Sequence, residues 1–114
     1  MVDDCIFCKI IAGDIPSSKV YEDEEVLAFL DISQVTPGHT LVVPKKHARN
    51  LLEMDETATA QLFARVSKVA KKVEAATQAK GMNIISNMEE VSGQTGFHTH
   101  VHIIPRYSDQ DELA

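Results

Sequence analysis

The sequence is short of basic residues and of long apolar runs, and both shortages limit the partners that the protein can have. Its 114 residues include 11 Lys and Arg against 17 Asp and Glu, so the formal net charge is −6. A nonspecific nucleic-acid binder usually carries a basic face, so no nucleic-acid partner is expected, although a few local groups suffice to hold one nucleotide phosphate. No apolar run approaches the roughly 20 residues that span a bilayer, so no membrane partner is expected either.

Internal repeats, linkers and a basic leader are also missing from the sequence. The opening residues MVDD are acidic, whereas a secretory signal starts with positive charge and continues into a longer apolar run. The protein is therefore expected in the cytoplasm. A chain of this length is the size of one small domain, so residues 1–114 are predicted to form a single domain.

Cysteine is scarce, and the only two cysteines, Cys5 and Cys8, lie three positions apart. A disulfide between them would close a very small loop, so a metal or redox role is favoured in a chain without a signal peptide. A Cys-x-x-Cys pair alone is half a zinc site. The alternative is a pair of free thiols on one helical turn.

The pattern of apolar residues predicts an α+β fold, in which an antiparallel five-stranded sheet is joined by one long helix and a short N-terminal helix. The short helix is predicted at 4–12, where Gly13 and Pro16 end it. Strands are predicted at 20–21, 26–30, 40–43, 82–86 and 98–104, with prolines ending the third and the last. The acidic tail at 109–114 is expected to be loose.

The long helix is predicted to start at Asp55, whose side chain can cap it, and to stop at Gly81. Four apolar residues recur at i, i+4, i+7 and i+11, so they share one face of the helix. They are Leu62, Val66, Val69 and Val73. This stripe is expected to cover one face of the sheet.

Three of the five histidines, His98, His100 and His102, alternate within five residues. In a strand, alternate side chains point to one face, so the three imidazoles are expected to project together while Val101 and Ile103 pack on the core. Such crowding of titratable groups favours a functional role over a set of structural histidines. A zinc site and nucleophilic catalysis remain as two alternatives. The preceding Gly-Gln-Thr-Gly offers hydrogen-bond donors suited to phosphate oxygens and favours phosphate chemistry.

The stretch GQTGFHTHVHIIPR, from Gly93 to Arg106, resembles the signature of the histidine triad family, in which three histidines alternate with apolar residues. The resemblance extends to PGHTLVVPKKH from Pro37 and to CIFCKII from Cys5, and it covers nearly the whole chain. Within the family, the chain is most similar to the nucleotide-binding branch that hydrolyses nucleoside phosphoramidates, in its bacterial form.

This resemblance implies a hydrolase that cleaves nucleoside 5′-phosphoramidates or related purine nucleotide conjugates at the α-phosphorus and releases a nucleoside monophosphate. His100 matches the nucleophile, which forms a covalent nucleotidyl-histidine, and His102 matches a residue that bonds to a nonbridging phosphate oxygen. His39 matches a fourth histidine beside the triad, although a packed histidine at a strand end is the alternative. Other matches to phosphate or leaving-group positions are Gln94, Thr95 and Asn87.

For the nucleoside, Asp31 matches the acidic residue that holds the ribose hydroxyls, and a turn residue at a strand end is its alternative. The residues that match an apolar slot for the base are Ile6, Phe7, Ile10 and Phe29. Plain core is the alternative for some of them. A slot that grips by packing predicts weak discrimination between adenine and guanine.

The resemblance also implies a structural zinc ion, about one per chain, because bacterial members complement the Cys5 and Cys8 pair with histidines that match His47 and His98. Two sulfurs and two nitrogens give a closed tetrahedral site. The family further implies a homodimer and no organic cofactor.

Three other functions remain open from the sequence. The first is a zinc hydrolase whose metal is held by the triad itself. The second is a nonenzymatic nucleotide sensor or scaffold. The third is a hydrolase of dinucleoside polyphosphates, which shares the chemistry at the α-phosphorus and differs only in the leaving group.

Overall fold

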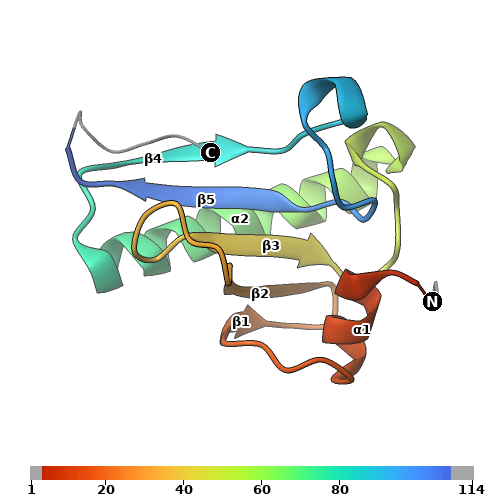
Figure 1. Cartoon of the computed structure of the whole chain (residues 1–114), viewed down its shortest axis with the longest axis horizontal. Helices are drawn as coiled ribbons and strands as arrows, with labels where there is room; N and C mark the ends of the chain where they lie inside the picture. The colour runs from red at the N-terminus through yellow and green to blue at the C-terminus, as the bar shows by residue number, and fades with distance from the viewer. Residues whose placement is uncertain (1–3, 109–114) are drawn as a thin grey trace.

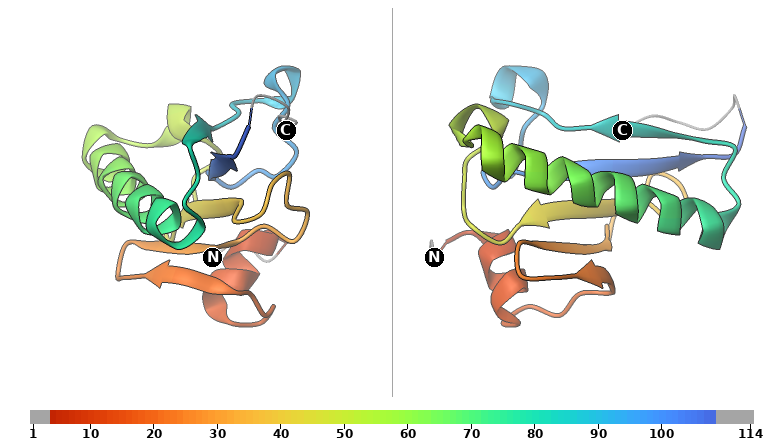
Figure 2. Two further views of the ribbon diagram at one scale, coloured as in Figure 1. Left: turned by 90° about the vertical axis from the view of Figure 1, so that its left-hand side faces the viewer. Right: turned by 180° about the vertical axis from the view of Figure 1, so that it is seen from behind.

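The computed structural model describes residues 4–108, in which five antiparallel strands form one sheet between a long and a short helix (Figures 1 and 2). The strand order is β1-β2-β3-β5-β4. The helices are α1 (Ile6–Ala12) and α2 (Glu56–Thr77), with 3-10 turns η1 (Leu51–Glu53) and η2 (Glu90–Ser92). The strands are β1 (Lys19–Glu22), β2 (Val26–Leu30), β3 (Thr40–Pro44), β4 (Gly81–Ile85) and β5 (Val101–Arg106). The predicted α+β class and both helices are confirmed.

The long helix α2 covers one face of the sheet (Figure 2). Its start is capped as predicted, because Asp55 Oδ1 accepts the Ala58 amide hydrogen at 2.8 Å. Its buried residues are the four of the predicted stripe, Leu62, Val66, Val69 and Val73. They pack against every second residue of the central strands, namely Val26, Ala28, Val42, Val101 and Ile103. Val101 and Ile103 therefore belong to the core, as their alternation with the histidines predicts.

The short helix α1 lies against the opposite face. Phe7, Ile10 and Ile11 pack there on the residues that point away from α2, which are Leu27, Phe29, Leu41 and Val43. Gly13 ends α1 in the left-handed conformation with φ 87°, which glycine adopts without steric cost. Since α1 is short, it leaves part of this face open beside the histidines.

Most predicted boundaries agree with the structure to within two residues, but two of them are wrong by about three. The helix α2 ends at Thr77, because Gln78 adopts the left-handed conformation at φ 57° and its N–H bonds to Glu74 O, whereas Gly81 opens β4 opposite Arg106. The last strand begins at Val101, three residues after His98, and it runs through Pro105. Pro105 is tolerated because the pairing of β5 with β3 ends at Ile103, so only β4 flanks the strand at the proline.

None of the helices within residues 4–108 combines the length and the apolar character needed to cross a membrane. The acidic tail predicted at 109–114 lies outside the described residues.

Candidate functional site

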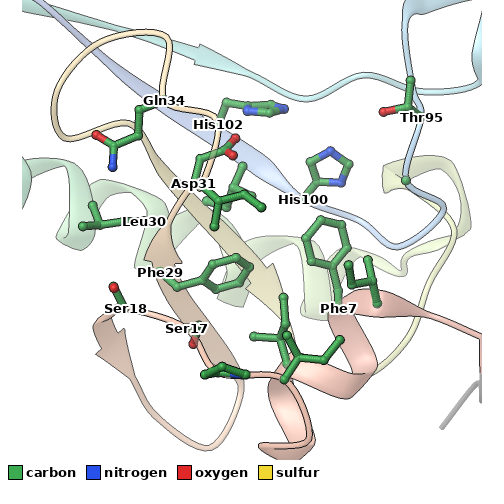
Figure 3. Close-up of a pocket in the computed structure, with 17 residues that line it drawn as sticks. Phe7, Ser17, Ser18, Phe29, Leu30, Asp31, Gln34, Thr95, His100 and His102 are labelled. Atoms are coloured by element: carbon green, nitrogen blue, oxygen red, sulfur yellow. The ribbon is translucent and has the colours of Figure 1, made fainter.

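A cavity of about 830 Å³ opens between α1, the ends of β2 and β3, and the histidine segment (Figure 3). Its apolar part is lined by Phe7, Ile10, Phe29 and Leu41. Its polar part is lined by Asp31, Thr95, His100 and His102. The volume and the mixture of apolar walls with a few polar groups are typical of a small-molecule site.

The ring of His100 has a fixed orientation in this cavity. Its Nδ1 lies 2.8 Å from His98 O, and a carbonyl only accepts, so Nδ1 carries the hydrogen and donates it. The ring of Phe7 packs on the imidazole with centroids 5.0 Å apart. The lone pair of neutral His100 is therefore on Nε2, the nitrogen that can act as a nucleophile.

His102 is oriented by a second histidine behind it. The amide of Val35 donates to His39 Nδ1 at 3.2 Å, so His39 carries its hydrogen on Nε2. His39 Nε2 lies 2.9 Å from His102 Nδ1, which accepts that hydrogen. His102 then carries its own hydrogen on Nε2. The chain of hydrogen bonds makes His102 a donor in its neutral form.

Burial keeps both imidazoles neutral. Desolvation lowers the pKa of His39 against the attraction of Asp31. Burial, with smaller contributions from His100 and His39, lowers the pKa of His102 to about 4. Near pH 7 neither ring is therefore charged. We call this chain of hydrogen bonds from His39 to His102 the histidine relay.

Asp31 lies at the end of β2 and faces the cavity from the side of His102 (Figure 3). One carboxylate oxygen, Oδ1, accepts the Ser33 amide hydrogen at 2.9 Å, and Oδ2 lies 3.6 Å from His39 Nε2. Asp31, His39 and His102 bring ligand-type atoms within 4.8 Å of one another. The hydrogen on His39 Nε2 occupies the direction that a metal would need, so this group is a hydrogen-bond network.

A second cluster joins α1 to the histidine segment and contains the four predicted metal ligands Cys5, Cys8, His47 and His98. His98 Nδ1 lies 3.3 Å from Cys5 Sγ, 3.6 Å from Cys8 Sγ and 3.1 Å from His47 Nδ1, and His47 Nδ1 lies 3.4 Å from Cys8 Sγ. Thiolate and imidazole ligands around one tetrahedral ion lie about 3.3–3.8 Å apart. The three sulfur–nitrogen distances fall in this range and the nitrogen–nitrogen distance is slightly shorter, so the donor set fits a metal ion.

The surroundings of His98 reinforce this fit. Its Nε2 donates to Pro44 O at 2.8 Å, which leaves the Nδ1 lone pair directed at the thiols, as in ligands that are oriented by an outer hydrogen bond. Burial, followed by the nearby His47 and His100, lowers the pKa of His98 to about 4, and burial raises the pKa of the Cys5 thiol. His98 therefore does not share one ligand set with His100 and His102, which argues against a metal held by the triad itself.

Most of the sequence-predicted site residues line the cavity. They are Ile6, Phe7, Ile10, Phe29, Asp31, Thr95, His100 and His102, with His39 directly behind. Gln94 and Asn87 are not among the lining residues. The Gln94 amide is buried, and its oxygen accepts from Asn50 and the Glu89 amide while its nitrogen donates to Arg49 O and Gly96 O. Asn87 lies against Gly93 instead.

Sequence reasoning missed two parts of the site. The first is the rim of the cavity, formed by the segment 15–18 together with Leu30, Ile32, Gln34 and Leu41. Nothing in the pattern distinguishes these residues from loop or core. The second is the pair of Arg49 and Glu89, whose side chains form two parallel hydrogen bonds at 2.8 and 2.9 Å. The two residues lie 40 positions apart, so no local signal could reveal them.

Comparisons with known proteins agree with this geometry. Residues 12–109 match the family described as HIT domain. A Bacillus subtilis (strain 168) protein called protein hit is 56% identical over 109 residues, which cover 96% of this chain and 75% of that protein. An adenylylsulfatase of Arabidopsis thaliana is 39% identical over 104 residues, which cover 91% of this chain and 53% of that protein.

Solved structures have the same fold. A crystal structure from Streptococcus mutans UA159 is 63% identical with a TM-score of 0.94, covering 100% of this chain and 73% of that one. A HIT family hydrolase from Clostridium thermocellum is 36% identical with a TM-score of 0.86, and each chain is covered completely. A zinc-bound histidine triad family protein from Mycobacterium smegmatis is 38% identical with a TM-score of 0.89, covering 97% of this chain and 80% of that one.

Proposed function

The chain belongs to the HIT domain family, and from that premise we propose that it hydrolyses nucleoside 5′-phosphoramidates, or related purine nucleotide conjugates, at the α-phosphorus. The HIT family hydrolase among its structural neighbours supports the reaction class. The observation that carries the proposal is the His100 Nδ1–His98 O hydrogen bond, because it leaves Nε2 as the free nitrogen of a ring that lines the cavity.

The reaction proceeds in two displacements at phosphorus. His100 Nε2 attacks the α-phosphorus, a nitrogen–phosphorus bond to the enzyme forms, the bond to the substrate nitrogen breaks, and the amine leaves with a proton taken from solvent. Water then displaces His100, releases the nucleoside monophosphate and returns one proton to solvent. The imidazole of His100 supplies this nucleophile without an organic cofactor.

The hydrogen on His102 Nε2 stabilises the charge that develops on a nonbridging phosphate oxygen. His39 acts through His102, because its own hydrogen holds His102 Nδ1 as an acceptor. Thr95 lines the cavity and is proposed to contact the phosphate or the leaving group. Gln94 is proposed to act indirectly, through its hydrogen bond to Gly96 O. Asn87 is proposed to lie on the phosphate side of the site.

Asp31 is proposed to hold the ribose hydroxyls, since Oδ2 remains available when Oδ1 accepts from Ser33. The base packs between Phe7, Ile10 and Phe29 beside Ile6. These walls offer packing area and few hydrogen-bonding groups, so adenine and guanine are bound with similar affinity.

The cluster of two thiols and two imidazoles is proposed to hold one structural zinc ion per chain, and the zinc-bound relative supports this assignment. Zinc would tie α1 to the segments that carry His47 and His98. Replacing Cys5 and Cys8 together by serine is expected to lower the zinc content and the unfolding temperature. Full zinc retention in that double variant, measured by metal analysis, would show that the ligand set is wrong.

The protein is further proposed to be a single-domain, cytoplasmic homodimer that binds neither nucleic acid nor membranes. The acidic net charge supports the absence of a nucleic-acid partner, and the limited core of so short a chain supports dimerisation.

The decisive experiment traps the covalent intermediate. Rapid quenching during turnover of an adenosine phosphoramidate with a good leaving group should leave an acid-labile nucleotide on the peptide that contains His100. His100→Ala should abolish turnover and still bind AMP. Net retention of configuration at phosphorus should follow from the two inversions. Net inversion, or an active His100→Ala variant, would favour direct attack by water.

A parallel panel of substrates separates the rival functions. Diadenosine polyphosphates and adenylyl sulfate, which fits the description of the Arabidopsis relative, share the α-phosphorus and differ in the leaving group. Faster cleavage of either would reassign the substrate within the same mechanism. Tight AMP binding without turnover of any of them would identify a nucleotide sensor.

A further inference from the structure

Glu89 has a backbone conformation that residues other than glycine rarely adopt. Its φ is 74° and its ψ is 157°, a region that is essentially restricted to glycine. A residue persists there only when its surroundings hold it, so the contacts of Glu89 identify what the conformation maintains.

The carboxylate of Glu89 is bound from two neighbouring residues. Arg49 donates from Nε and Nη2 at 2.8 and 2.9 Å, and Asn50 Nδ2 donates to Oε2 at 2.7 Å. These bonds, that from Arg49 first, lower the pKa of Glu89. An isolated exposed ion pair contributes little, but a bidentate pair within a network fixes geometry. The guanidinium is also stacked on the Phe97 ring, 4.2 Å from its centroid.

The backbone of Glu89 bonds to Gln94 directly, and its carboxylate is connected to Gln94 through Asn50. The Glu89 amide donates to Gln94 Oε1 at 2.8 Å, and Asn50 Nδ2 donates to the same oxygen at 3.1 Å. Gln94 Nε2 in turn donates to Gly96 O at 2.9 Å. The unusual conformation thus places the amide and the carboxylate of one residue where both can hold the 94–96 segment.

That segment lies beside the reacting histidine. Thr95 and Gly96 line the cavity, and a Cβ added at Gly96 would lie 3.2 Å from Phe7 Cε2 and 3.7 Å from His100 Cε1. A shift of the Gly96 backbone would therefore change the space around His100 and Phe7.

We propose that Glu89, clamped by Arg49, is a positioning residue that fixes the Thr95–Gly96 wall of the cavity against His100. The proposal rests on the proposed function for its effect on the rate, and its effect on the loop stands independently. Misplacement of a reacting group by about 1 Å can lower a rate by about 100-fold. The nucleoside end of the cavity, at Asp31 and Phe29, is not touched by this network.

The test uses two substitutions of Glu89 and one matched control. Glu89→Gln removes the charge and keeps the size, whereas Glu89→Gly also relieves the backbone conformation. Glu90→Gln removes the same charge from the exposed neighbour, which acts on Arg49 through charge and therefore reports the purely electrostatic part of the effect. We expect both Glu89 variants to lower kcat by about 10- to 100-fold, with the dissociation constant for adenosine, which lacks the phosphate, unchanged and Glu90→Gln like wild type.

Stability separates positioning from simple destabilisation. Glu89→Gly should keep or raise the unfolding temperature while it lowers kcat, a combination that a merely structural residue would not produce. A wild-type kcat in both variants would overturn the proposal.

Hydrogen exchange tests the clamp without turnover. The amides of 94–97 should exchange faster in Glu89→Gln than in wild type and in Glu90→Gln. That result supports the clamp even if the wild type cleaves no phosphoramidate, which would count against the proposed function alone. Unchanged exchange at 94–97 would overturn the clamp even in a fully active enzyme.

Discussion

The roles of individual histidines follow from partners that can only donate or only accept. The amide of Val35 and the carbonyl of His98 are such partners, and they fix the hydrogens of His39 and His100. Because His39 then directs the hydrogen of His102, the two residues are expected to contribute unequally. The positions of these hydrogens thus predict that His102 contributes more to the rate than His39.

Removing His102 should lower kcat by about 10²–10³-fold, because one donor to the developing charge is lost. His39→Ala should lower kcat by less, since His102 remains but can turn. Steady-state rates with an adenosine phosphoramidate would measure both, with AMP binding as the control for an intact cavity. A loss in His39→Ala as large as that in His100→Ala would contradict the relay.

The depressed pKa of His102 also predicts a pH dependence of stability. In the unfolded chain a histidine titrates near 6.5, whereas folded His102 titrates at about 4. Between these values the unfolded state binds more protons, so the free energy of unfolding should fall as the pH falls from about 6.5 to about 4. Urea unfolding across this range should show a shallower dependence in His102→Asn than in wild type. The same pH dependence of stability in both proteins would argue against a buried, neutral His102.

At the scale of elements, the loop before β3 is fixed against the end of α2. Gly38 has φ 90°, and an added Cβ would lie 2.8 Å from Thr77 Cγ2. Thr77 cannot easily turn away, because its hydroxyl donates to Val73 O at 2.8 Å. The loop that carries His39 therefore depends on the absence of a side chain at this position.

Gly38→Ala should consequently destabilise the protein more than Gly13→Ala. Gly13 has a similar φ of 87° but open space around it, so its substitution carries only the conformational penalty of about 1–2 kcal/mol. The difference between the two variants in the free energy of unfolding, measured with denaturant, gives the cost of the clash with Thr77. Equal losses would mean that Thr77 moves aside without a cost in stability.

The elements also show what the sequence could predict. The stripe on α2 and the cap at Asp55 were predictable because they depend on local periodicity and local hydrogen bonding. The start of β5 was not, because His98 leaves the ladder for the Cys5 and Cys8 thiols, which lie 93 and 90 positions away. The division of the histidines between two clusters came from the family resemblance, since alternation alone places all three on one face.

For the molecule as a whole, the two polar clusters are linked through α1. Cys5 and Cys8 hold one end of the helix to His98, and Phe7, between them, packs on His98 and His100 with centroids 5.8 and 5.0 Å apart. Loss of the proposed zinc site should therefore loosen a wall of the cavity as well as the fold. Because α1 belongs both to the cysteine–histidine cluster and to the wall of the cavity, a change at the cluster is expected to affect nucleotide binding.

The sheet has two edges, and they differ in their capacity to pair with a second copy. At β1 the register shifts between Lys19 and Tyr21, and Lys72 Nζ already binds Val20 O at 2.9 Å, features that protect an edge. The other edge, β4, pairs regularly with β5 over five residues and exposes 44% of Ile84. The proposed homodimer is therefore expected to form at β4.

Sedimentation at micromolar concentration should give twice the chain mass of 12.6 kDa. Ile84→Asp should shift the protein toward the monomer, because it places a charge in an interface that would exclude water. Leu52→Asp is the matched control, since Leu52 is 76% exposed on η1, outside the sheet. A wild type that sediments only at 12.6 kDa would refute the dimer, and a dimeric Ile84→Asp variant would refute pairing at β4.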